Sequence, residues 1–387
     1  ISQITGSIET ETVMHRKSIA QICSSRSWGG MEMHVLSLSD QLRQAGLNIT
    51  VWCAPDSELS RRAARTDLPI FNFEPRGYFN PKAFYTTCRQ LKKEPPDLLH
   101  VHFGKDLWTL VPALHGAGKI PIVFTKHIGT QKPKRDPLHR YLYRHVCRLI
   151  AISQVIAKNL LDTHPVQDGQ IEIIHHGVDV ALFQDPGTWR GSVRREWGIG
   201  DDQFLIGTIG RLQDGKGHLE FLDMAAEIGL SFPFTRFVIV GEPTRGEEYR
   251  AQPIYDKIKS LQLQDKVLLP GFRADIPAVL AALDLFAFPS RAEAFGLVLI
   301  EAMAAGKPVI STRCDGVLDI VRHEENGLLF DANRVQAFTQ AVQRLLEHPG
   351  LRERLARQAL LTAVGQFSSE RFLSRIMDLY SKCLEQG

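Results

Sequence analysis

The sequence predicts an α/β protein with two doubly wound, Rossmann-like domains that face each other across a cleft. Its length supports two domains, because 387 residues exceed the size at which one hydrophobic core keeps growing. Short apolar runs alternate with amphipathic stretches, as in parallel sheets covered by helices on both faces. This alternation occurs twice, with a segment rich in Gly and Pro between the two series.

The first series begins with a strand predicted over residues 18–23, a glycine turn and a helix over 31–46. Val35, Leu38 and Leu42 have helical spacing, and Gly46 ends the helix. Further strands are predicted at 48–53, 68–73, 97–103, 120–125 and 148–153. We assign residues 14–178 to an N-terminal domain. Residues 1–13 are polar and lack apolar periodicity, so we expect a disordered leader or an expression remnant.

The second series gives a C-terminal domain over residues 179–367. Its predicted strands lie at 204–210, 237–241, 266–272, 285–289 and 307–312, with helices between them. The segment 175–191 is the predicted linker. The final helix, within 368–387, is expected to pack back on the first domain. Ligands of such sheets bind at the carboxyl ends of the strands, which predicts a site in the cleft.

Composition excludes several classes of protein. No apolar run approaches the roughly 18 residues of a membrane-spanning helix, and no signal peptide opens the chain, so we expect a cytoplasmic protein. A net charge of +3 is too small to indicate nucleic-acid binding. The six cysteines show no CxxC pair, which indicates reduced thiols and no metal site.

Three loops could contact a phosphorylated ligand. Gly29 and Gly30 form the first turn, where backbone could approach a phosphate or sugar, although an ordinary tight turn explains them equally well. Arg211 follows a strand and Lys216 begins a helix, so the two cations could neutralise a diphosphate whose charge grows as a glycosidic bond breaks. A solvated lysine and a paired surface arginine are the structural alternative.

The third loop carries two glutamates separated by seven residues. If a helix begins near Gly296, its first amides point at a phosphate, and Glu301 can accept hydrogen bonds from ribose hydroxyls. Glu293 precedes the helix and could contact the sugar. A carboxylate in the apolar surroundings of Glu301 requires a hydrogen-bonding partner. The backbone expected at the phosphate comprises Phe295, Gly296, Leu297 and Val298.

Two further features lie in the first domain. His127 follows a predicted strand and could hydrogen-bond the donor or orient the acceptor, although a lone histidine is more often structural. The following segment is basic and contains interleaved aromatic and aliphatic residues, as at an anionic membrane surface, although a solvated basic face or an anionic soluble acceptor would also fit. The basic residues are Lys126, Lys132, Lys134, Arg135, Arg140, Arg144 and Arg148.

From residue 18 to the C-terminal helix, the chain resembles the family 4 glycosyltransferases, which have the GT-B fold. The resemblance rests on GGMEMHVLSLSDQLRQAG, HHGVDVALF, TIGRLQDGKG, EAFGLVLIEAMAAGKPVIS and DGVLDIV with ENGLLF, in this order. It departs at His176, where the family usually has Asn before Gly, and at Asp315, where the family has a double glycine. Neither departure alters the cations or the glutamates.

The resemblance implies retaining hexosyl transfer without a covalent intermediate, in which the leaving phosphate takes the acceptor's proton. It assigns Arg211 and Lys216 to the diphosphate, Glu293 to the hexose and Glu301 to the ribose, with His127 as the active-site histidine. The expected donor is a UDP-hexose, with GDP-mannose next, and no metal or other cofactor is expected.

The resemblance also makes residues 14–178 the acceptor-binding domain and residues 179–367 the sugar-nucleotide-binding domain. The expected acceptor is a glycan or glycolipid of the cell envelope, such as a lipopolysaccharide precursor, and a peripheral position at the inner face of the membrane is expected for the protein. The alternatives on the same fold are a non-hydrolysing sugar-nucleotide epimerase, a pyridoxal-phosphate phosphorylase and a catalytically inactive sugar-nucleotide-binding scaffold.

Overall fold

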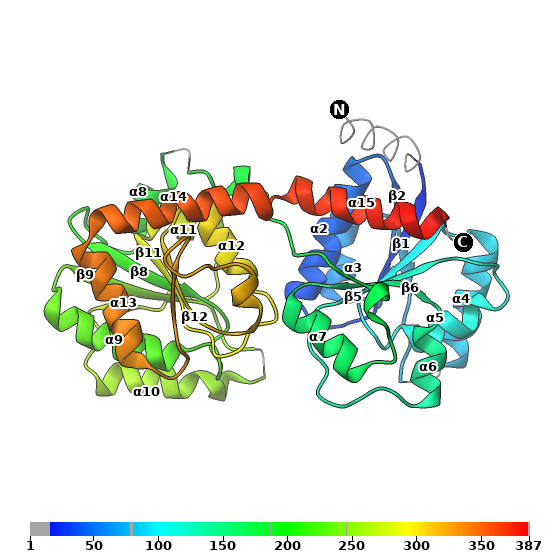
Figure 1. Cartoon of the computed structure of the whole chain (residues 1–387), viewed down its shortest axis with the longest axis horizontal. Coiled ribbons are helices and arrows are strands. Elements are labelled where there is room, and N and C mark those ends of the chain that lie inside the picture. The colour runs from blue at the N-terminus through cyan, green and yellow to red at the C-terminus, as the bar shows by residue number, and fades with distance from the viewer. Residues whose placement is uncertain (1–15, 78–79, 186, 245, 386–387) are drawn as a thin grey trace. The chain divides into compact units, whose positions relative to one another are not determined.

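The computed structural model describes residues 16–77, 80–185, 187–244 and 246–385 (Figure 1). The chain forms two compact units, the first comprising 1–175 with 371–387 and the second 176–370. The sequence had placed these divisions at 178/179 and 367/368. The predicted leader, residues 1–13, lies outside the described residues. No helix in the described ranges is long and apolar enough to cross a membrane.

The first unit is built on a seven-stranded parallel sheet with the order β3-β2-β1-β4-β5-β6-β7. Its strands are β1 (Ser18–Cys23), β2 (Asn48–Cys53), β3 (Ile70–Asn72), β4 (Leu98–Val101), β5 (Ile122–Lys126), β6 (Val146–Ala151) and β7 (Ile171–Ile173). Its helices are α2 (Gly30–Gln44), α3 (Glu58–Ala63), α4 (Pro81–Lys93), α5 (Leu107–Leu114), α6 (Pro137–Tyr143), α7 (Gln154–Thr163) and α15 (Ser369–Glu385). The sequence did not predict β7, a three-residue edge strand.

The C-terminal helix α15 contributes to the core of the first unit, as the sequence predicted. Its apolar face packs with residues of α2 and α3 against one face of the sheet. Ile376, Leu379 and Tyr380 are fully or almost fully buried there. Their spacing of three to four residues puts them on one side of the helix, so the sequence pattern and the packing agree.

The second unit has a six-stranded parallel sheet with the order β10-β9-β8-β11-β12-β13. Its strands are β8 (Phe204–Ile209), β9 (Thr235–Val240), β10 (Val267–Leu268), β11 (Leu285–Phe288), β12 (Val309–Thr312) and β13 (Leu328–Phe330). Its helices are α8 (Trp189–Glu196), α9 (His218–Ser231), α10 (Gln252–Ser260), α11 (Ile276–Ala282), α12 (Leu297–Ala304), α13 (Val335–Glu347) and α14 (Pro349–Gln366). The short strand β13 was also not predicted.

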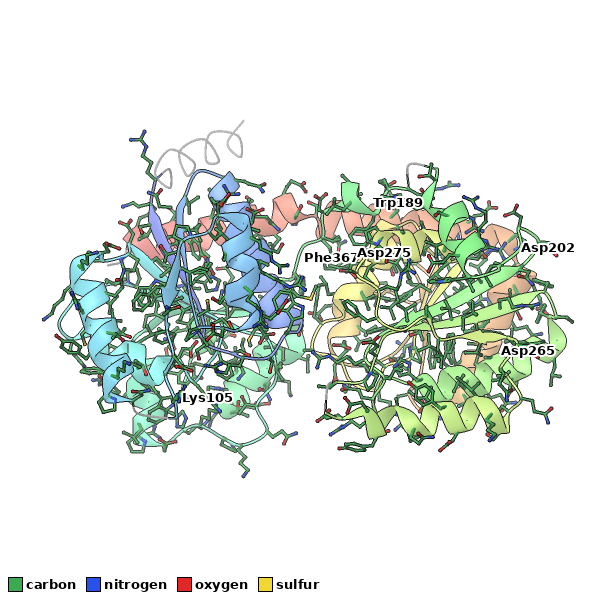
Figure 2. The ribbon with its side chains drawn as sticks, turned by 180° about the vertical axis from the view of Figure 1, so that it is seen from behind. Lys105, Trp189, Asp202, Asp265, Asp275 and Phe367 are labelled. Atoms are coloured by element: carbon green, nitrogen blue, oxygen red, sulfur yellow. The ribbon has the colours of Figure 1, made fainter. Side chains whose placement is uncertain are left out.

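The direction of the strands decides where the loops of the second unit gather. Asp202 and Asp265 precede β8 and β10 and lie at the same edge of this unit (Figure 2). Because the strands are parallel, the loops that follow β8, β11 and β12 lie at the opposite edge. On one face of the sheet, α9, α10 and α13 contribute a core that includes Phe221, Phe237 and Phe338.

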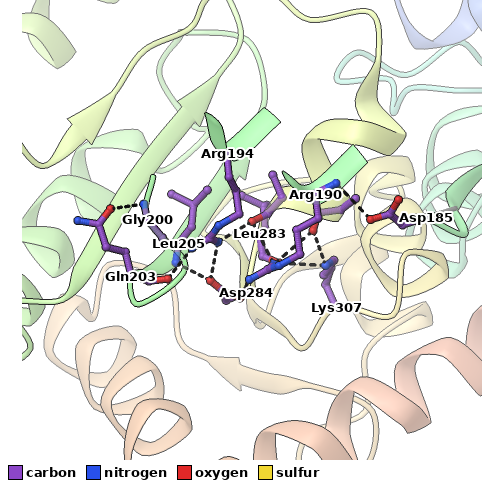
Figure 3. A network of polar contacts seen from close by, with 11 residues as sticks. Asp185, Arg190, Arg194, Gly200, Gln203, Leu205, Leu283, Asp284 and Lys307 are labelled. Atoms are coloured by element: carbon purple, nitrogen blue, oxygen red, sulfur yellow. Dashed lines mark hydrogen bonds and ion pairs between the residues drawn. The ribbon is translucent and has the colours of Figure 1, made fainter. Parts of the chain in front are cut away.

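A buried ionic network fixes α8 to the sheet of the second unit (Figure 3). Arg194 is only 2% exposed, and it donates to Asp284 at 3.1 Å and to the carbonyl oxygens of Ala282, Gly200 and Gln203. Asp284 also accepts from Arg190 at 2.7 Å and from the Leu205 amide at 2.7 Å. This carboxylate therefore compensates two guanidinium groups and one strand amide at the amino end of β8.

We expect Asp284→Asn to destabilise the second unit by about 3 kcal/mol or more, because removal of one partner of a buried pair leaves an uncompensated charge. Urea unfolding measures this change. The matched control is Glu58→Gln, since Glu58 also accepts from two arginines, Arg61 and Arg62, but on the exposed surface. The control should change stability far less. Equal changes in the two variants would contradict a structural role for the network.

Candidate functional site

Close backbone approach shapes the first loop of the candidate site, residues 210–217 after β8. Gly217 has φ of +74°, and a Cβ placed on it would lie 2.0 Å from the carbonyl oxygen of Pro289. Only glycine therefore lets this loop pack against the end of β11. Arg211 stands exposed directly after β8, and Lys216 lies at the end of the loop, immediately before the residue that caps α9.

Lys216 and Glu293 form an ion pair that joins two of the predicted loops. Lys216 Nζ lies 2.7 Å from Glu293 Oε2, and both side chains are partly exposed. The carboxylate therefore holds the lysine at the carboxyl edge of the sheet. An incoming anion could compete for this ammonium group and release the glutamate toward neutral hydroxyl groups.

Residues that follow β12 hold the loop that carries Glu293 in place through hydrogen bonds and close packing. The Gly316 amide donates to the Glu293 carbonyl oxygen at 2.9 Å, and a Cβ at Gly316 would lie 2.4 Å from the Ala294 carbonyl oxygen. Asp315 accepts from the Glu293 amide at 3.3 Å and has φ of +36°. Gly316 is therefore the glycine that this close approach requires. Asp315, where the chain departs from the double glycine of the family, accepts a hydrogen bond from the loop of Glu293.

Helix α12 begins as the sequence predicted, with Gly296 as its N-cap at φ of +105°. The first hydrogen bond at the amino end of α12 runs from the Leu299 amide to the Gly296 carbonyl oxygen. The Leu297 and Val298 amides therefore lie in the first turn, where amides have no partner within the helix. The sequence assigned only the backbone of Phe295 to the phosphate, and the structure buries its ring against His176 and Phe367. Only its backbone can contact a ligand.

Glu301 lies one turn into α12 and is the most strongly perturbed acid of this region. Burial raises the pKa of its carboxyl group to about 7. Among the described residues, no group forms a hydrogen bond or an ion pair with this carboxyl group. The residue is partly exposed, so a ligand can reach its carboxyl group and donate hydrogen bonds to it, as the sequence suggests for a ribose.

The glycine turn of the first unit leaves room for a ligand. Gly29 is the N-cap of α2, and a Cβ placed on Gly30 would meet no atom within 4 Å.

The buried carboxylate of Asp106 fixes the end of β1 before this turn. Asp106 is fully buried and accepts from the Ser24 amide at 3.0 Å. Burial raises the pKa of Asp106 to about 7. The sequence did not single out Asp106.

The sequence analysis treated His127 as a lone histidine, but the structure places two other histidines beside it. His34 from α2 and His102 after β4 lie beside it, with His102 Nδ1 at 3.1 Å from His127 Nε2. The ring of His34 meets both of the other rings edge to face. His102 and His127 are buried and His34 is partly exposed. The one sequence signal for His102 was its position at the end of a predicted strand.

A chain of hydrogen bonds sets the tautomer of these histidines. With the Gln21 amide in its present orientation, Oε1 accepts from His102 Nε2–H at 2.8 Å, which makes His102 Nδ1 the acceptor for His127 Nε2–H. Gln21 Nε2 donates to Tyr380 Oη at 2.9 Å, and Tyr380 lies on α15. The C-terminal helix therefore helps to orient the candidate histidine.

The basic segment after His127 is not one helix. It consists of a loop, the seven-residue α6, a turn and the start of β6. Tyr143, Leu142 and Val146 belong to the core, whereas Leu138 is 61% exposed. Four of its seven cations are exposed, namely Lys132, Arg135, Arg140 and Arg144, and the other three (Lys126, Lys134 and Arg148) are partly buried. Burial lowers the pKa of Lys126 to about 8.

The candidate residues fall into two groups, one in each unit. In the second unit, the structure brings Lys216 and Glu293 together and places them, like Arg211 and the start of α12, at the carboxyl edge of the sheet. In the first unit, it surrounds His127 with residues that the sequence did not single out, namely His34, His102, Gln21 and Tyr380.

Both units match models of glycosyltransferase families. Residues 190–361 match the model of glycosyl transferases group 1, and residues 28–182 match that of Glycosyltransferase Family 4. A D-inositol 3-phosphate glycosyltransferase of Salinispora arenicola is 28% identical over 311 residues, which cover 74% of this chain and 69% of that protein.

Solved structures share the fold along nearly the whole chain. Alr3699/HepE of Anabaena, solved in complex with UDP, superposes with a TM-score of 0.83 at 23% identity, covering 95% of this chain and all of that one. A glycosyltransferase of Rickettsia africae gives a TM-score of 0.86 at 20% identity, covering 96% of this chain and all of the other.

Proposed function

The chain belongs to the family 4 glycosyltransferases of the GT-B fold, and from this premise we propose that it transfers a hexose from a sugar nucleotide with retention of anomeric configuration. The observation that carries the proposal is the arrangement at the carboxyl edge of the second unit. A lysine, the first amides of a helix and a partly exposed carboxyl group without a partner among the described residues lie there. These are the groups that a diphosphate joined to a ribose requires.

The donor is a UDP-hexose in this proposal, with GDP-mannose next. The solved relative of Anabaena was crystallised with UDP, which supports the choice of base. The Lys216 ammonium group and the exposed Arg211 take the diphosphate, the α12 amides add partial positive charge, and Glu301 accepts from the ribose hydroxyls. Glu293, displaced from Lys216 by the diphosphate, hydrogen-bonds the hexose.

Charge development explains why cations are the principal catalytic groups. As the bond between the hexose and the diphosphate breaks, negative charge grows on the leaving phosphate, and Lys216 and Arg211 stabilise it. The acceptor hydroxyl attacks the same face of the sugar and gives its proton to a leaving phosphate oxygen. No metal is required in this scheme. His127 is assigned to the same reaction as the group that orients the reacting sugar.

The acceptor is proposed to be an anionic glycolipid of the cell envelope, such as a lipopolysaccharide precursor. Four exposed cations at Lys132, Arg135, Arg140 and Arg144 and the exposed Leu138 support this choice. The relative of Salinispora acts on an inositol that carries a phosphate, which is also an anionic acceptor. The family matches favour transfer over an epimerase, and turnover distinguishes a transferase from an inactive scaffold.

We expect Lys216→Ala to reduce turnover of UDP-glucose on the order of 100-fold, because developing phosphate charge loses its cation. Release of UDP with an acceptor extract measures the rate, and thermal stabilisation by UDP-glucose measures binding. Lys257→Ala is the matched control, since Lys257 in the same unit is equally exposed and lies 2.6 Å from a carboxylate, that of Asp223. Near-wild-type turnover in Lys216→Ala would reject this donor site.

The affinity for UDP-glucose should rise about tenfold between pH 6 and pH 8, because a carboxyl group with a pKa near 7 accepts hydrogen bonds best when ionised. Raising the pH through this value ionises Glu301 and so favours the bound state. Glu301→Gln should bind weakly at both values and lose the pH dependence, whereas Glu227→Gln on α9 should retain it. Calorimetry at both pH values measures the change. An unchanged dependence in Glu301→Gln would exclude the proposed ribose contact.

The purified protein should co-sediment with vesicles that contain an anionic phospholipid, and less so in high salt, because exposed cations attract the headgroups. Charge reversal at Arg140 and Arg144 should remove most of this binding. Reversal at Lys92 and Lys93, which are exposed at the end of α4 in the same unit, is the control. Equal binding to neutral and anionic vesicles, or none to either, would favour a soluble acceptor.

A further inference from the structure

Three imidazole rings from separate parts of the first unit converge on one point. The candidate ligand nitrogens of His34, His102 and His127 all lie within 4.8 Å of one another. The ring centroids are 5.2, 5.4 and 5.7 Å apart. Three imidazoles on one tetrahedral zinc, with Zn–N bonds of about 2.0–2.1 Å, would have centroids about 5.2 Å apart. The rings thus already have nearly the spacing that one shared ion imposes.

The hydrogen bonds around His102 prepare it as a ligand. Its Nε2–H donates to Gln21 Oε1 at 2.8 Å, so Nδ1 carries the lone pair on the side of the other two rings. Gln21 is held in turn by Tyr380. Metal-binding histidines commonly donate their second ring nitrogen to an oxygen in this way, which fixes both tautomer and ring orientation. Binding of an ion through Nε2 of His127 requires that its proton move from Nε2 to Nδ1.

The chemistry of the cluster selects the kind of ion. Imidazole nitrogens suit Zn²⁺ and its neighbours among the transition metals, whereas Mg²⁺ and Ca²⁺ prefer oxygen ligands. His34 is partly exposed, which gives the ion a path from solvent and leaves a fourth position open to water. Rigid elements present the ligands, since His34 lies within α2 and the other two histidines follow the adjacent strands β4 and β5.

We propose that His34, His102 and His127 form a binding site for one transition-metal ion of the zinc class, and that its occupancy inhibits the enzyme. The inhibitory part rests on the proposed function, in which His127 orients the reacting sugar. An ion on Nε2 of His127 removes that nitrogen from substrate contact and holds the ring in place. The residues proposed for the nucleotide and the diphosphate lie in the second unit and include no member of the histidine cluster, so the ion should spare binding of UDP.

Calorimetric titration of the full chain, without a histidine tag and after treatment with a chelator, tests the binding. One equivalent of Zn²⁺ should bind, and Mg²⁺ should not. His34→Ala and His102→Ala should each weaken the affinity for Zn²⁺ at least tenfold. The control is the double variant His115→Ala/His145→Ala, which removes another neighbouring histidine pair of the same unit. The absence of a one-to-one isotherm, or variants that bind like the wild type, would overturn the site.

Spectroscopy and turnover separate this proposal from the proposed function. Co²⁺ in the site should give the intense visible absorption of a four-coordinate ion, and His34→Ala should abolish it. The chelator-treated enzyme should transfer hexose, and Zn²⁺ should reduce the rate with a midpoint that shifts upward in His34→Ala. UDP, which lacks the hexose that His127 is proposed to orient, should stabilise the protein equally with and without Zn²⁺. Zinc binding without any transferase activity would reject only the proposed function, and transferase activity without zinc binding would reject only the metal site.

Discussion

A parallel sheet places the carboxyl ends of all its strands at one edge, and the candidate site residues depend on that constraint. Arg211 follows β8, Glu293 follows β11 and Asp315 follows β12, although they are far apart in the sequence. In the first unit, His102 and His127 follow adjacent strands in the same manner. Each side chain needs only a short loop to reach its site. The hydrophobic core that holds the strands therefore also determines where these side chains lie.

In the second unit, close packing of backbone against backbone sets the positions of the site loops. The loops that carry Lys216 and Glu293 approach each other because Gly217 and Gly316 lack a Cβ, and any side chain there would overlap a carbonyl oxygen. The resulting ion pair keeps a cation at the edge of the sheet before any substrate binds. In the proposed function, the diphosphate displaces Glu293 from Lys216, and the carboxylate then accepts from the hydroxyl groups of the hexose.

In the first unit, buried polar groups set the orientation of the candidate histidine His127. His100, Gln21 and Tyr380 lie in the interior, where burial lowers the pKa of His100 to about 3 and keeps it neutral. The Tyr380 hydroxyl lies 2.6 Å from His100 Nδ1 and accepts from Gln21 Nε2. The bond from Gln21 orients its amide, and Gln21 Oε1 in turn sets the proton positions of His102 and His127. Since Tyr380 comes from α15, the last residues of the chain support a histidine that lies some 250 positions earlier.

Local pattern determined the fold class, because alternating apolar and amphipathic segments leave few options other than two covered parallel sheets, and the matches to solved glycosyltransferases confirm it. It also located the start of α12 and the helical period of α15. The three-residue strands β7 and β13 escaped prediction because so short a segment has no period of its own. Only the tertiary structure decided that Lys216 pairs with Glu293, that Phe295 is buried, and that three histidines meet at one point. These depend on strand order and on contacts between distant segments, which no local period encodes.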